Sequence, residues 1–505
     1  MALANFCLPA LPAPPSWFPG HMKKFTRMLP TLLTRTDVVL ELRDSRLPLT
    51  SINRTLEATP VHDFFQCRVT LIHDTPDFYS PGRVRIGALR KWRMERGWDP
   101  NDPTKRNVSV QPCEHIVVLN KRDLVPAWGM EPFQKAMEKK FPHQRLLFAS
   151  WHRPRDIRTL NEILVNIARR HPHAMELNVL VIGMPNVGKS TLLNALRHQG
   201  IKGPTAKAFQ TSANPGMTQA LSTRLKVSME PLIYAYDSPG VMLPYLGRGK
   251  EGAERGVKLA LIAGIKEGLY DMEALAGYLL HRLTVLNPIS PVYLHLLPKG
   301  AEATTDLEHF LTQLAQRMGM LKKRGEADLA RAAVYFVRWW REEGGLLAAK
   351  DSFRHQKAAP RDSATAIAAP CPGTGKPEGE ATVGETSGEA PGSLDIGTST
   401  STSNSTYAAS TAASALAPSD AAGLVVPKVE GWGFDFQWDW QEADMKRRSS
   451  DPELFMQEKM EKCIDEYLEM IEREEKDDAN VSPTQIKKRL VMEEKARRKA
   501  RYVKS

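Results

Sequence analysis

The chain of 505 residues is longer than one ordinary domain, and its hydrophobic content of 42% is enough for a sizeable core. Its formal net charge of +11 favours a polyanionic partner, either nucleic acid or an anionic membrane surface, although surplus Lys and Arg can also serve only to solvate the surface. The five cysteines are scattered without Cys-x-x-Cys spacing, which argues against a disulfide framework or a zinc site and for a reducing compartment. No apolar run reaches the roughly 18 residues that span a bilayer, so we expect no transmembrane segment.

The beginning of the chain is poor in acidic residues. The first is Asp37, and Lys23, Lys24, Arg27 and Arg35 precede it. This pattern makes residues 1–15 a candidate organelle-targeting segment. The sequence "SWFPGHMKK" that follows looks instead like part of the working protein.

Alternating strands and helices come next. Five short apolar runs predict strands, at residues 37–43, 115–119, 146–149, 177–182 and 232–236. Helix-like stretches at 130–140 and 157–170 stand between them, which predicts a mostly parallel α/β sheet covered on both faces. Residues 74–112 are rich in Pro, Asp, Arg and Trp, and we expect them to form an insertion on a surface connection.

The second half of the chain lacks a strand pattern. Helical periodicity appears at residues 257–281, 304–319 and 326–342 and predicts an all-helical domain over 250–348. Residues 349–430 consist mainly of Ala, Ser, Thr, Gly, Pro and Glu. This composition predicts a disordered linker, because such a segment cannot bury enough apolar surface to offset its ordering entropy. Residues 431–505 are expected to form a charged, helical C-terminal tail.

The stretch from Gly183 to Ser190, "GMPNVGKS", matches the phosphate loop G-x-x-x-x-G-K-[ST] between a predicted strand and a predicted helix. Its glycines let backbone N–H groups surround a β-phosphate, and the helix N-terminus adds its positive dipole. Lys189 would bridge the β- and γ-phosphates, and the Ser190 hydroxyl would bind Mg²⁺. We expect nucleotide contacts from Pro185, Asn186, Val187, Gly188, Lys189, Ser190 and Thr191.

A D-x-x-G turn, Asp237 to Gly240, follows the last predicted strand. Alone this pattern is common in turns, but behind a phosphate loop it predicts that Asp237 holds Mg²⁺ and that the Gly240 N–H senses the γ-phosphate. Thr218 in "NPGMT" would complete the Mg²⁺ ligands with Ser190 and Asp237. A loop threonine without a ligand role remains the alternative.

The tetrapeptide "NKRD", Asn120 to Asp123, follows a buried strand and predicts guanine recognition. The Asp123 carboxylate can accept from the N1–H and the 2-amino group of guanine, which adenine does not present together. Asn120 would tie this loop to the phosphate loop, and the Lys121 stem would lie along the base. Ala149-Ser150 fits the backbone loop beside the guanine oxygen, although the usual order is Ser-Ala.

The base-reading loop precedes the phosphate loop here, whereas in an ordinary GTPase it comes later. Joining the two ends of an ordinary GTPase chain and opening it after the D-x-x-G turn produces this order. Ligand binding tolerates the change, because it depends only on where the loops lie at the carboxyl ends of the parallel strands. We therefore predict a circularly permuted P-loop GTPase domain over residues 16–249. Its D-x-x-G turn leads directly into the helical domain, which suggests that nucleotide state is transmitted there.

Seven segments carry a family resemblance: "WFPGHMKK" (17–24), "DVVLELRDSRLPLTSIN" (37–53), "VVLNKRDLV" (117–125), "VLVIGMPNVGKSTLLNAL" (179–196), "ANPGMT" (213–218), "YDSPGVMLP" (236–244) and "DLARAAVYFVRWW" (328–340). Over roughly residues 16–347 the chain resembles the circularly permuted GTPases of the RbgA/YlqF type. The resemblance implies slow GTP hydrolysis that the ribosome stimulates, as a checkpoint in assembly of the large ribosomal subunit. It also implies an rRNA partner, with which the basic balance agrees.

Catalysis raises a separate question, because Val241 follows Gly240 where Ras-like enzymes have a water-orienting glutamine. The resemblance implies that His21 of "PGHM" swings toward the γ-phosphate, although a histidine beside Trp17 and Phe18 can equally be structural. By the same resemblance, Asn186 corresponds to an asparagine linked to K⁺ ligation, so K⁺ is a candidate second cofactor beside Mg²⁺.

The compartment follows from the acid-poor start and the resemblance, which favour the mitochondrial matrix, with peripheral inner-membrane association as a further candidate. A cytoplasmic or plastid setting is the alternative. Two other functions stay open: a nucleotide-dependent RNA-binding scaffold with negligible hydrolysis, and a membrane-surface regulatory GTPase that uses its basic tail. The compact relatives have no counterpart of the long extension beyond residue 349.

Overall fold

The computed structural model describes the parts of the chain on which the site depends. The described residues are 10–15, 17–57, 87–99, 106, 111–142, 144–201, 203, 208–209, 218, 221–288, 290–350, 429–439, 444, 451–476 and single residues between 484 and 495. All of them belong to one unit formed by Met1–Ala358 and Pro427–Ser505. The expected disordered linker lies almost entirely outside the described residues, as do residues 1–9 of the expected targeting segment.

The strands β1 to β6 form a six-stranded sheet in the order β3-β2-β1-β4-β6-β5. The strands are β1 (Val38–Asp44), β2 (Glu114–Asn120), β3 (Arg145–Phe148), β4 (Leu177–Gly183), β5 (Leu225–Ser228) and β6 (Ile233–Asp237). All neighbouring pairs are parallel except β5 and β6, which are antiparallel. The mostly parallel α/β sheet predicted from the sequence is confirmed. Within this sheet β5 alone was missed, because this short edge strand alternates with polar residues and lacks the continuous apolar run of a buried parallel strand.

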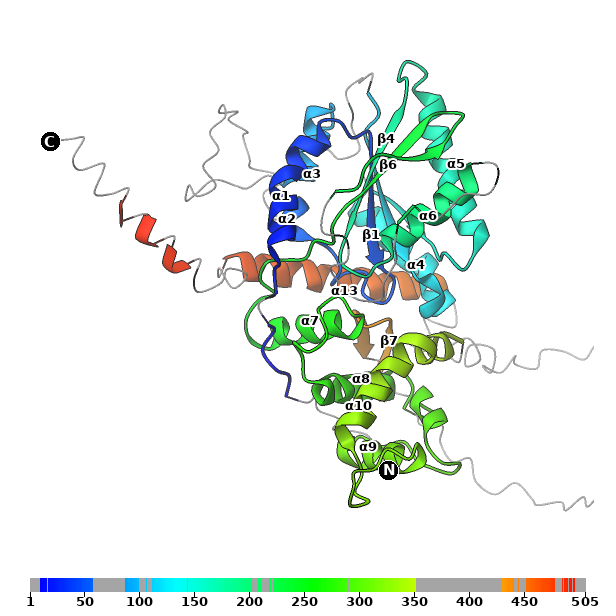
Figure 1. The fold of residues 1–505 in the computed structure, drawn as a ribbon, viewed down its shortest axis with the longest axis vertical. Coiled ribbons are helices and arrows are strands. Elements are labelled where there is room, and N and C mark those ends of the chain that lie inside the picture. The colour runs from blue at the N-terminus through cyan, green and yellow to red at the C-terminus, as the bar shows by residue number, and fades with distance from the viewer. Residues whose placement is uncertain are drawn as a thin grey trace, which may run out of the picture. The chain divides into compact units, whose positions relative to one another are not determined.

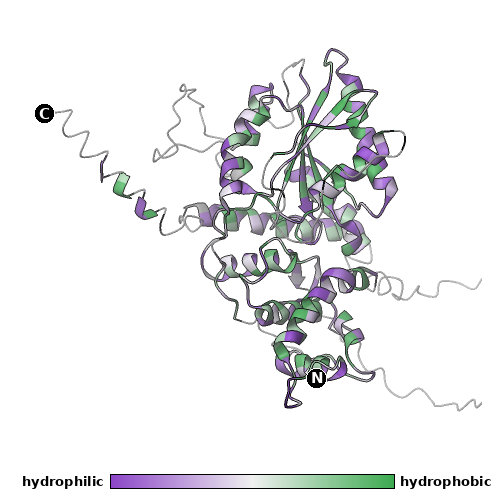
Figure 2. Cartoon of the chain, in the orientation of Figure 1, coloured by the Kyte–Doolittle hydropathy of each residue, from purple (hydrophilic) through white to green (hydrophobic). Residues whose placement is uncertain are grey.

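Helices cover both faces of the sheet (Figure 1). One face is covered by α1 (Gly20–Leu33), α3 (Ala88–Glu95) and α4 (Met130–Lys140), and the other by α5 (Pro154–Arg170) and α6 (Lys189–Gly200). Figure 2 shows the strands as predominantly hydrophobic, as a sheet buried on both faces requires. Each fully buried Leu, Ile or Val side chain contributes about 1.5–3 kcal/mol to folding, so these layers hold the strand ends that carry the site loops.

The expected surface insertion at residues 74–112 is in part a structural helix. Leu89 and Trp92 of α3 are buried against the sheet, and Trp92 donates its Nε1–H to Thr36 O at 3.1 Å. Arg96 pairs with Asp37 at 3.3 Å. The prediction is therefore wrong for residues 88–96, because a basic and aromatic composition concealed an amphipathic helix. Residues 74–86, 100–105 and 107–110 lie outside the described residues.

A helical region follows the D-x-x-G turn. Its elements are α7 (Gly249–Leu261), α8 (Met272–Leu286), η4 (Val292–Leu296), α9 (Leu307–Arg317) and α10 (Leu329–Trp339), which continues into the π-helical turn η5 (Trp340–Gly344). Asp271, Asp306 and Asp328 cap three of these helices by accepting backbone N–H groups. The expected helical segment 257–281 is divided between α7 and α8. The buried core of this region is continuous with that of the sheet.

The C-terminal segment begins with a hairpin of β7 (Val429–Trp432) and β8 (Phe436–Asp439), which the sequence did not predict. The rings of Trp432 and Phe436 lie 5.5 and 5.6 Å from that of Phe133 in α4. The helix α13 (Pro452–Lys476) then packs along α4 (Figure 1). Residues 429–439 and 452–476, expected to belong to a charged, helical C-terminal tail or to the linker before it, are therefore part of the folded unit. None of the described helices is both long and apolar enough to cross a membrane.

Candidate guanine-nucleotide site

Three loops meet at one edge of the sheet, where the parallel strands end. The base-reading loop follows β2, the phosphate loop follows β4, and the D-x-x-G turn follows β6. Strand register aligns them, because Asp44 pairs with Asn120 while Val181 pairs with Asp237. The carboxyl ends of parallel strands are where α/β folds bind ligands. The chain order of these loops is permuted, yet in space they form one site.

The backbone of the phosphate loop requires glycine at Gly188. This residue has φ +92°, and a Cβ there would lie 2.7 Å from Asn120 Nδ2. Gly240 of the D-x-x-G turn has a similar constraint, because its Cβ would lie 2.6 Å from Pro185 N. Val187 is buried, and Thr191 stands in the first turn of α6, whose N-terminus faces the loop. The geometry is that of an anion site at a helix N-terminus.

Lys189 is held over this loop by backbone oxygens. Its Nζ donates to Met184 O at 2.8 Å and to Gly183 O at 3.3 Å. Burial lowers the pKa of Lys189 to about 8, and the nearby Asp237 carboxylate opposes the shift. An amine in this position can receive a phosphate as its counter-charge, which is the role that the sequence predicts for it.

Ser190 and Asp237 lie in direct contact, and they fit an Mg²⁺ site. The Ser190 hydroxyl donates to Asp237 Oδ2 at 2.5 Å, while Asp237 Oδ1 is buried and has no hydrogen-bond partner among the described residues. Burial raises the pKa of Asp237. A hydroxyl and a carboxylate are the hard oxygen ligands that Mg²⁺ takes alongside phosphate and water. Ser190 and Asp237 would hold the ion, which would supply positive charge to neutralise the phosphates of a bound nucleotide.

Thr218, the third expected Mg²⁺ ligand, is itself described and half-buried. Residues 210–217 and 219–220 on either side of it lie outside the described residues. Its role as a switch threonine therefore stays a prediction.

Two side chains connect the base-reading loop to the phosphate loop. Asn120, which is fully buried, donates its Nδ2–H to Val187 O at 2.7 Å. Lys121 Nζ donates to Asn186 O at 2.9 Å, and its backbone adopts the left-handed conformation with φ 61°. Asp123 Oδ1 is buried without a hydrogen-bond partner among the described residues. A buried acceptor of this kind suits the N–H groups of a guanine edge.

Asp44 at the end of β1 supports this loop, although it belongs to none of the nucleotide motifs. Its carboxylate accepts from Arg46 Nε at 2.9 Å and Nη2 at 2.8 Å, and it pairs with Lys121 Nζ at 3.1 Å. Burial alone would raise the pKa of Asp44, but the charges of Arg46 and Lys121 hold it well below its usual range. The signal in the sequence was the charged "RDSR" directly after an apolar strand.

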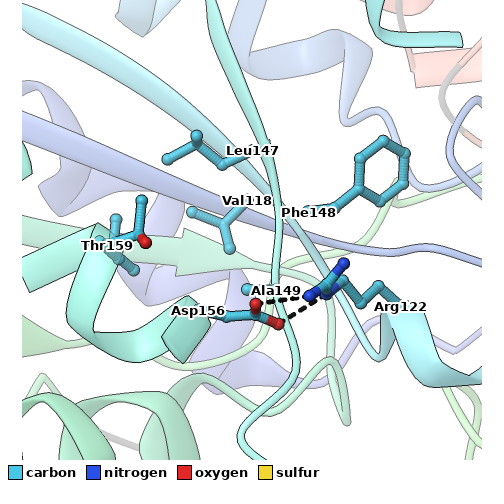
Figure 3. A pocket seen from close by; sticks show the side chains of 8 residues that line it. Val118, Arg122, Leu147, Phe148, Ala149, Asp156 and Thr159 are labelled. Carbon is cyan, nitrogen blue, oxygen red and sulfur yellow. Dashed lines mark hydrogen bonds and ion pairs between the residues drawn. The ribbon is translucent and has the colours of Figure 1, made fainter. Parts of the chain in front are cut away.

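The loop at Ala149-Ser150 lies beside the base-reading loop, and its contact with the guanine oxygen stays a prediction. Arg122 N donates to Ala149 O at 3.2 Å, and Ser150 N donates to Asp156 Oδ2 at 3.0 Å. The indole of Trp151 packs against the phosphate loop, since a Cβ on Gly188 would meet it at 2.8 Å. A cavity of about 120 Å³ lies behind these loops, lined in part by Arg122, Ala149 and Asp156 (Figure 3).

The two residues that bear on catalysis occupy different environments. Val241 is buried in the core of the face covered by α1, and its backbone N–H donates to Gly183 O at 3.0 Å. His21 stands half-buried in the first turn of α1, with Nε2 buried and without a hydrogen-bond partner among the described residues. Burial lowers the pKa of His21 below its usual value. Its catalytic role stays a prediction, as does K⁺ ligation by Asn186.

The fold and the converged loops define a circularly permuted P-loop GTPase, in which the base-reading loop precedes the phosphate loop along the chain. This prediction is confirmed. A family model described as 50S ribosome-binding GTPase matches residues 178–287, the stretch from β4 to the end of α8.

Known proteins similar to this chain carry related names. Mitochondrial ribosome-associated GTPase 1 of Mus musculus is 26% identical over 347 residues, covering 66% of this chain and 87% of the mouse protein. Mitochondrial GTPase 1 of Schizosaccharomyces japonicus is 28% identical and covers 65% of this chain and 87% of its own length. The solved structure of GNP-bound YlqF from T. maritima aligns over 65% of this chain and 95% of its own, with 18% identity and a TM-score of 0.34. The similarity expected from the sequence motifs is thus found.

Proposed function

We propose that this protein is a GTP-hydrolysing assembly factor of the mitochondrial large ribosomal subunit, acting as a checkpoint late in its maturation. The observation that carries the proposal is the hydrogen bond from Asn120 to Val187 O, which joins the base-reading loop to the phosphate loop in permuted order. Relatives named as mitochondrial ribosome-associated GTPases support the ribosomal partner and the compartment. We propose the mitochondrial matrix as its location, with peripheral association at the inner membrane.

An rRNA surface in the helical region is part of this proposal. Lys322, Lys323 and Arg324 are exposed in the turn between α9 and α10, and Lys299 is exposed after η4. Their positive charges suit contacts with RNA phosphates. Such contacts recognise mainly the shape of the RNA, and they weaken as salt concentration rises. The exposed Met318 and Leu321 stand beside the same turn and add apolar surface to it.

In the proposed cycle, Asp123 selects guanine and Lys189 holds the β- and γ-phosphates. Ser190, Thr218 and Asp237 hold Mg²⁺, and Asn186 contributes to a K⁺ site near the phosphates. His21 supplies the group that the buried Val241 cannot, by moving toward the γ-phosphate when the ribosome binds. The Gly240 N–H senses that phosphate.

A scaffold with negligible hydrolysis is the second candidate, and the half-buried position of His21 favours it. GTP turnover should be measured for the full chain with and without mitochondrial large subunits, in K⁺ and in Na⁺. We expect stimulation by the subunits and faster turnover in K⁺. The matched variant His21→Ala should lower the stimulated rate and leave GTP affinity nearly intact, whereas turnover equal to background would favour the scaffold.

The partner and the compartment can be tested together by crosslinking the protein to RNA in cells and sequencing the bound RNA. Recovery of mitochondrial large-subunit rRNA is expected. Recovery of cytosolic or plastid rRNA would contradict the compartment, and pelleting with anionic liposomes but not with ribosomal particles would favour a membrane-surface GTPase instead.

A further inference from the structure

We propose that Asp156 is a positioning residue for guanine recognition, which holds the base-reading loop and the Ala149-Ser150 loop in one fixed arrangement. The proposal rests on the guanine-nucleotide function above and adds a residue outside the sequence motifs. Asp156 lies in the first turn of α5, more than thirty residues after the "NKRD" loop.

Asp156 contacts both loops at once (Figure 3). Its Oδ2 accepts from Arg122 Nε at 2.6 Å, and its Oδ1 accepts from Arg122 Nη2 at 2.6 Å. The same Oδ2 accepts the backbone N–H of Ser150 at 3.0 Å. A third connection is direct, since Arg122 N donates to Ala149 O at 3.2 Å. The carboxylate therefore fixes the distance between the two loops through one bidentate pair and one backbone bond.

Arg122 is the third residue of "NKRD", directly before the base-reading Asp123. Asn120 anchors one end of this loop on the phosphate loop, and Lys121 turns the backbone through a left-handed conformation. Without an anchor on the other side, the short 3₁₀ turn Arg122–Leu124 could rotate the Asp123 carboxylate away from the base. The Arg122 side chain supplies that anchor. A binding group held by a supporting residue recognises its ligand more strictly than one on a loose loop.

Exposure and charge indicate that the Arg122–Asp156 pair holds the two loops more strongly than an ordinary surface ion pair would. The Asp156 side chain is 9% exposed and that of Arg122 is 25% exposed. Bidentate guanidinium–carboxylate pairs are among the strongest protein hydrogen bonds, whereas fully exposed pairs contribute little. The N-terminal dipole of α5 also favours a carboxylate at Asp156.

A competing interpretation predicts the opposite effect of Asp156 on nucleotide affinity. The Ser150 N–H is occupied by Asp156, so the carboxylate could instead compete with the guanine oxygen for this donor. Removal of the carboxylate would then strengthen nucleotide binding. A positioning role requires that its removal weakens binding and relaxes the choice of base.

The test measures dissociation constants of GDP and of IDP, which lacks the 2-amino group, for the full chain and its variants. For Asp156→Ala and Arg122→Ala we expect GDP affinity to fall about tenfold to a hundredfold, through faster dissociation. The preference for GDP over IDP should shrink, because a displaced Asp123 no longer reads the 2-amino group. The double variant should be little worse than either single variant, since both remove the same pair.

Controls separate positioning from general destabilisation. Glu162→Gln removes an exposed carboxylate from the same helix and should change neither affinity nor base preference. If the alanine variant does not fold, Asp156→Asn is used in its place, because it keeps the side-chain volume. It should still reduce the preference for GDP over IDP. An unchanged preference in a folded Asp156 variant, or tighter GDP binding, would overturn the proposal. Failure of the wild-type chain to bind GDP would instead contradict the proposed function itself.

Discussion

The side-chain amide of Asn186 in the phosphate loop donates a hydrogen bond to the backbone oxygen of Ala263 at 2.8 Å. Both residues adopt left-handed backbone conformations, each with φ 58°. Ala263 lies in the turn after α7, so the phosphate loop touches the helical region directly. Arg341 of η5 holds the same turn by donating to Ala260 O and Leu261 O, both at 2.8 Å. A shift of Asn186 on nucleotide binding would therefore be transmitted to α7 and to η5.

Asn186→Ala should uncouple the helical region from the nucleotide. In the wild-type chain we expect different amide-exchange rates for residues 257–271 with GDP and with a non-hydrolysable GTP analogue, because the phosphate loop moves the turn after α7. In the variant this difference should diminish. Equal exchange in both nucleotide states of the wild type would rule out this route of coupling.

Lys189 should make nucleotide affinity depend on pH. Its pKa is lowered to about 8 by burial, so above that pH the chain without nucleotide carries an increasingly neutral amine. A bound phosphate favours the charged form, and binding then takes up a proton. We expect GDP affinity to fall as pH rises from 7 to 9, approaching about tenfold per pH unit above the pKa. Calorimetry in buffers of different ionisation enthalpy measures the proton uptake, and its absence at pH 8.5 would contradict the assignment.

Asp123→Asn should exchange guanine for xanthine as the preferred base. The carboxylate accepts from the 2-amino group of guanine, whereas an amide can donate to the 2-oxo group of xanthine. GDP affinity should fall by at least about a hundredfold, because a site built for specific hydrogen bonds strongly rejects the analogue that lacks them. Competition of XDP and GDP for the variant measures the change. Equal preference for GDP in variant and wild type would remove Asp123 from base reading.

Glu474 of α13 should be important for stability. It pairs with Arg54 at 2.6 Å and with Arg255 at 2.9 Å, and its side chain is 5% exposed. Glu474→Ala leaves two buried guanidinium groups without this carboxylate, and breaking buried pairs typically costs about 3–5 kcal/mol. Thermal unfolding measures the loss. Glu469→Ala, an exposed change on the same helix, should have little effect; equal melting temperatures for both variants would contradict a structural role of α13.

His281 should make the helical region less stable at acidic pH. Burial lowers the pKa of His281 to about 4, Arg282 adds to the shift, and Glu254 opposes it. Between pH 6.5 and 4 the unfolded chain binds a proton that the folded chain does not, so stability falls as the pH falls. The expected loss from pH 7 to pH 5 is about 1–2 kcal/mol. His281→Gln should reduce this dependence in melting temperatures recorded across that range, and an identical slope would exclude His281 as the cause.

The sequence by itself determined five of the six strands of the sheet, the three nucleotide loops and their permuted order. Each depends on local pattern: apolar runs for β1, β2 and β4, glycines for the phosphate loop, and the "NKRD" and D-x-x-G spacings. Parallel strands bring such loops to one edge whatever their order along the chain. The roles of His21, Thr218 and Asn186 remain predictions, since they concern states that the chain adopts with its ligands.

Only the tertiary structure decided which residues support those loops. Asp44 and Asp156 belong to no nucleotide motif, and their importance depends on partners brought near by folding, Lys121 and Arg122. The C-terminal segment shows the same limit, because its charge and helical propensity predicted a charged, helical tail but not where that tail packs. Trp432 instead packs on Phe133 from about 300 residues away in the chain. Contacts between distant segments have no local signature, since burial and charge pairing arise only once the chain has folded.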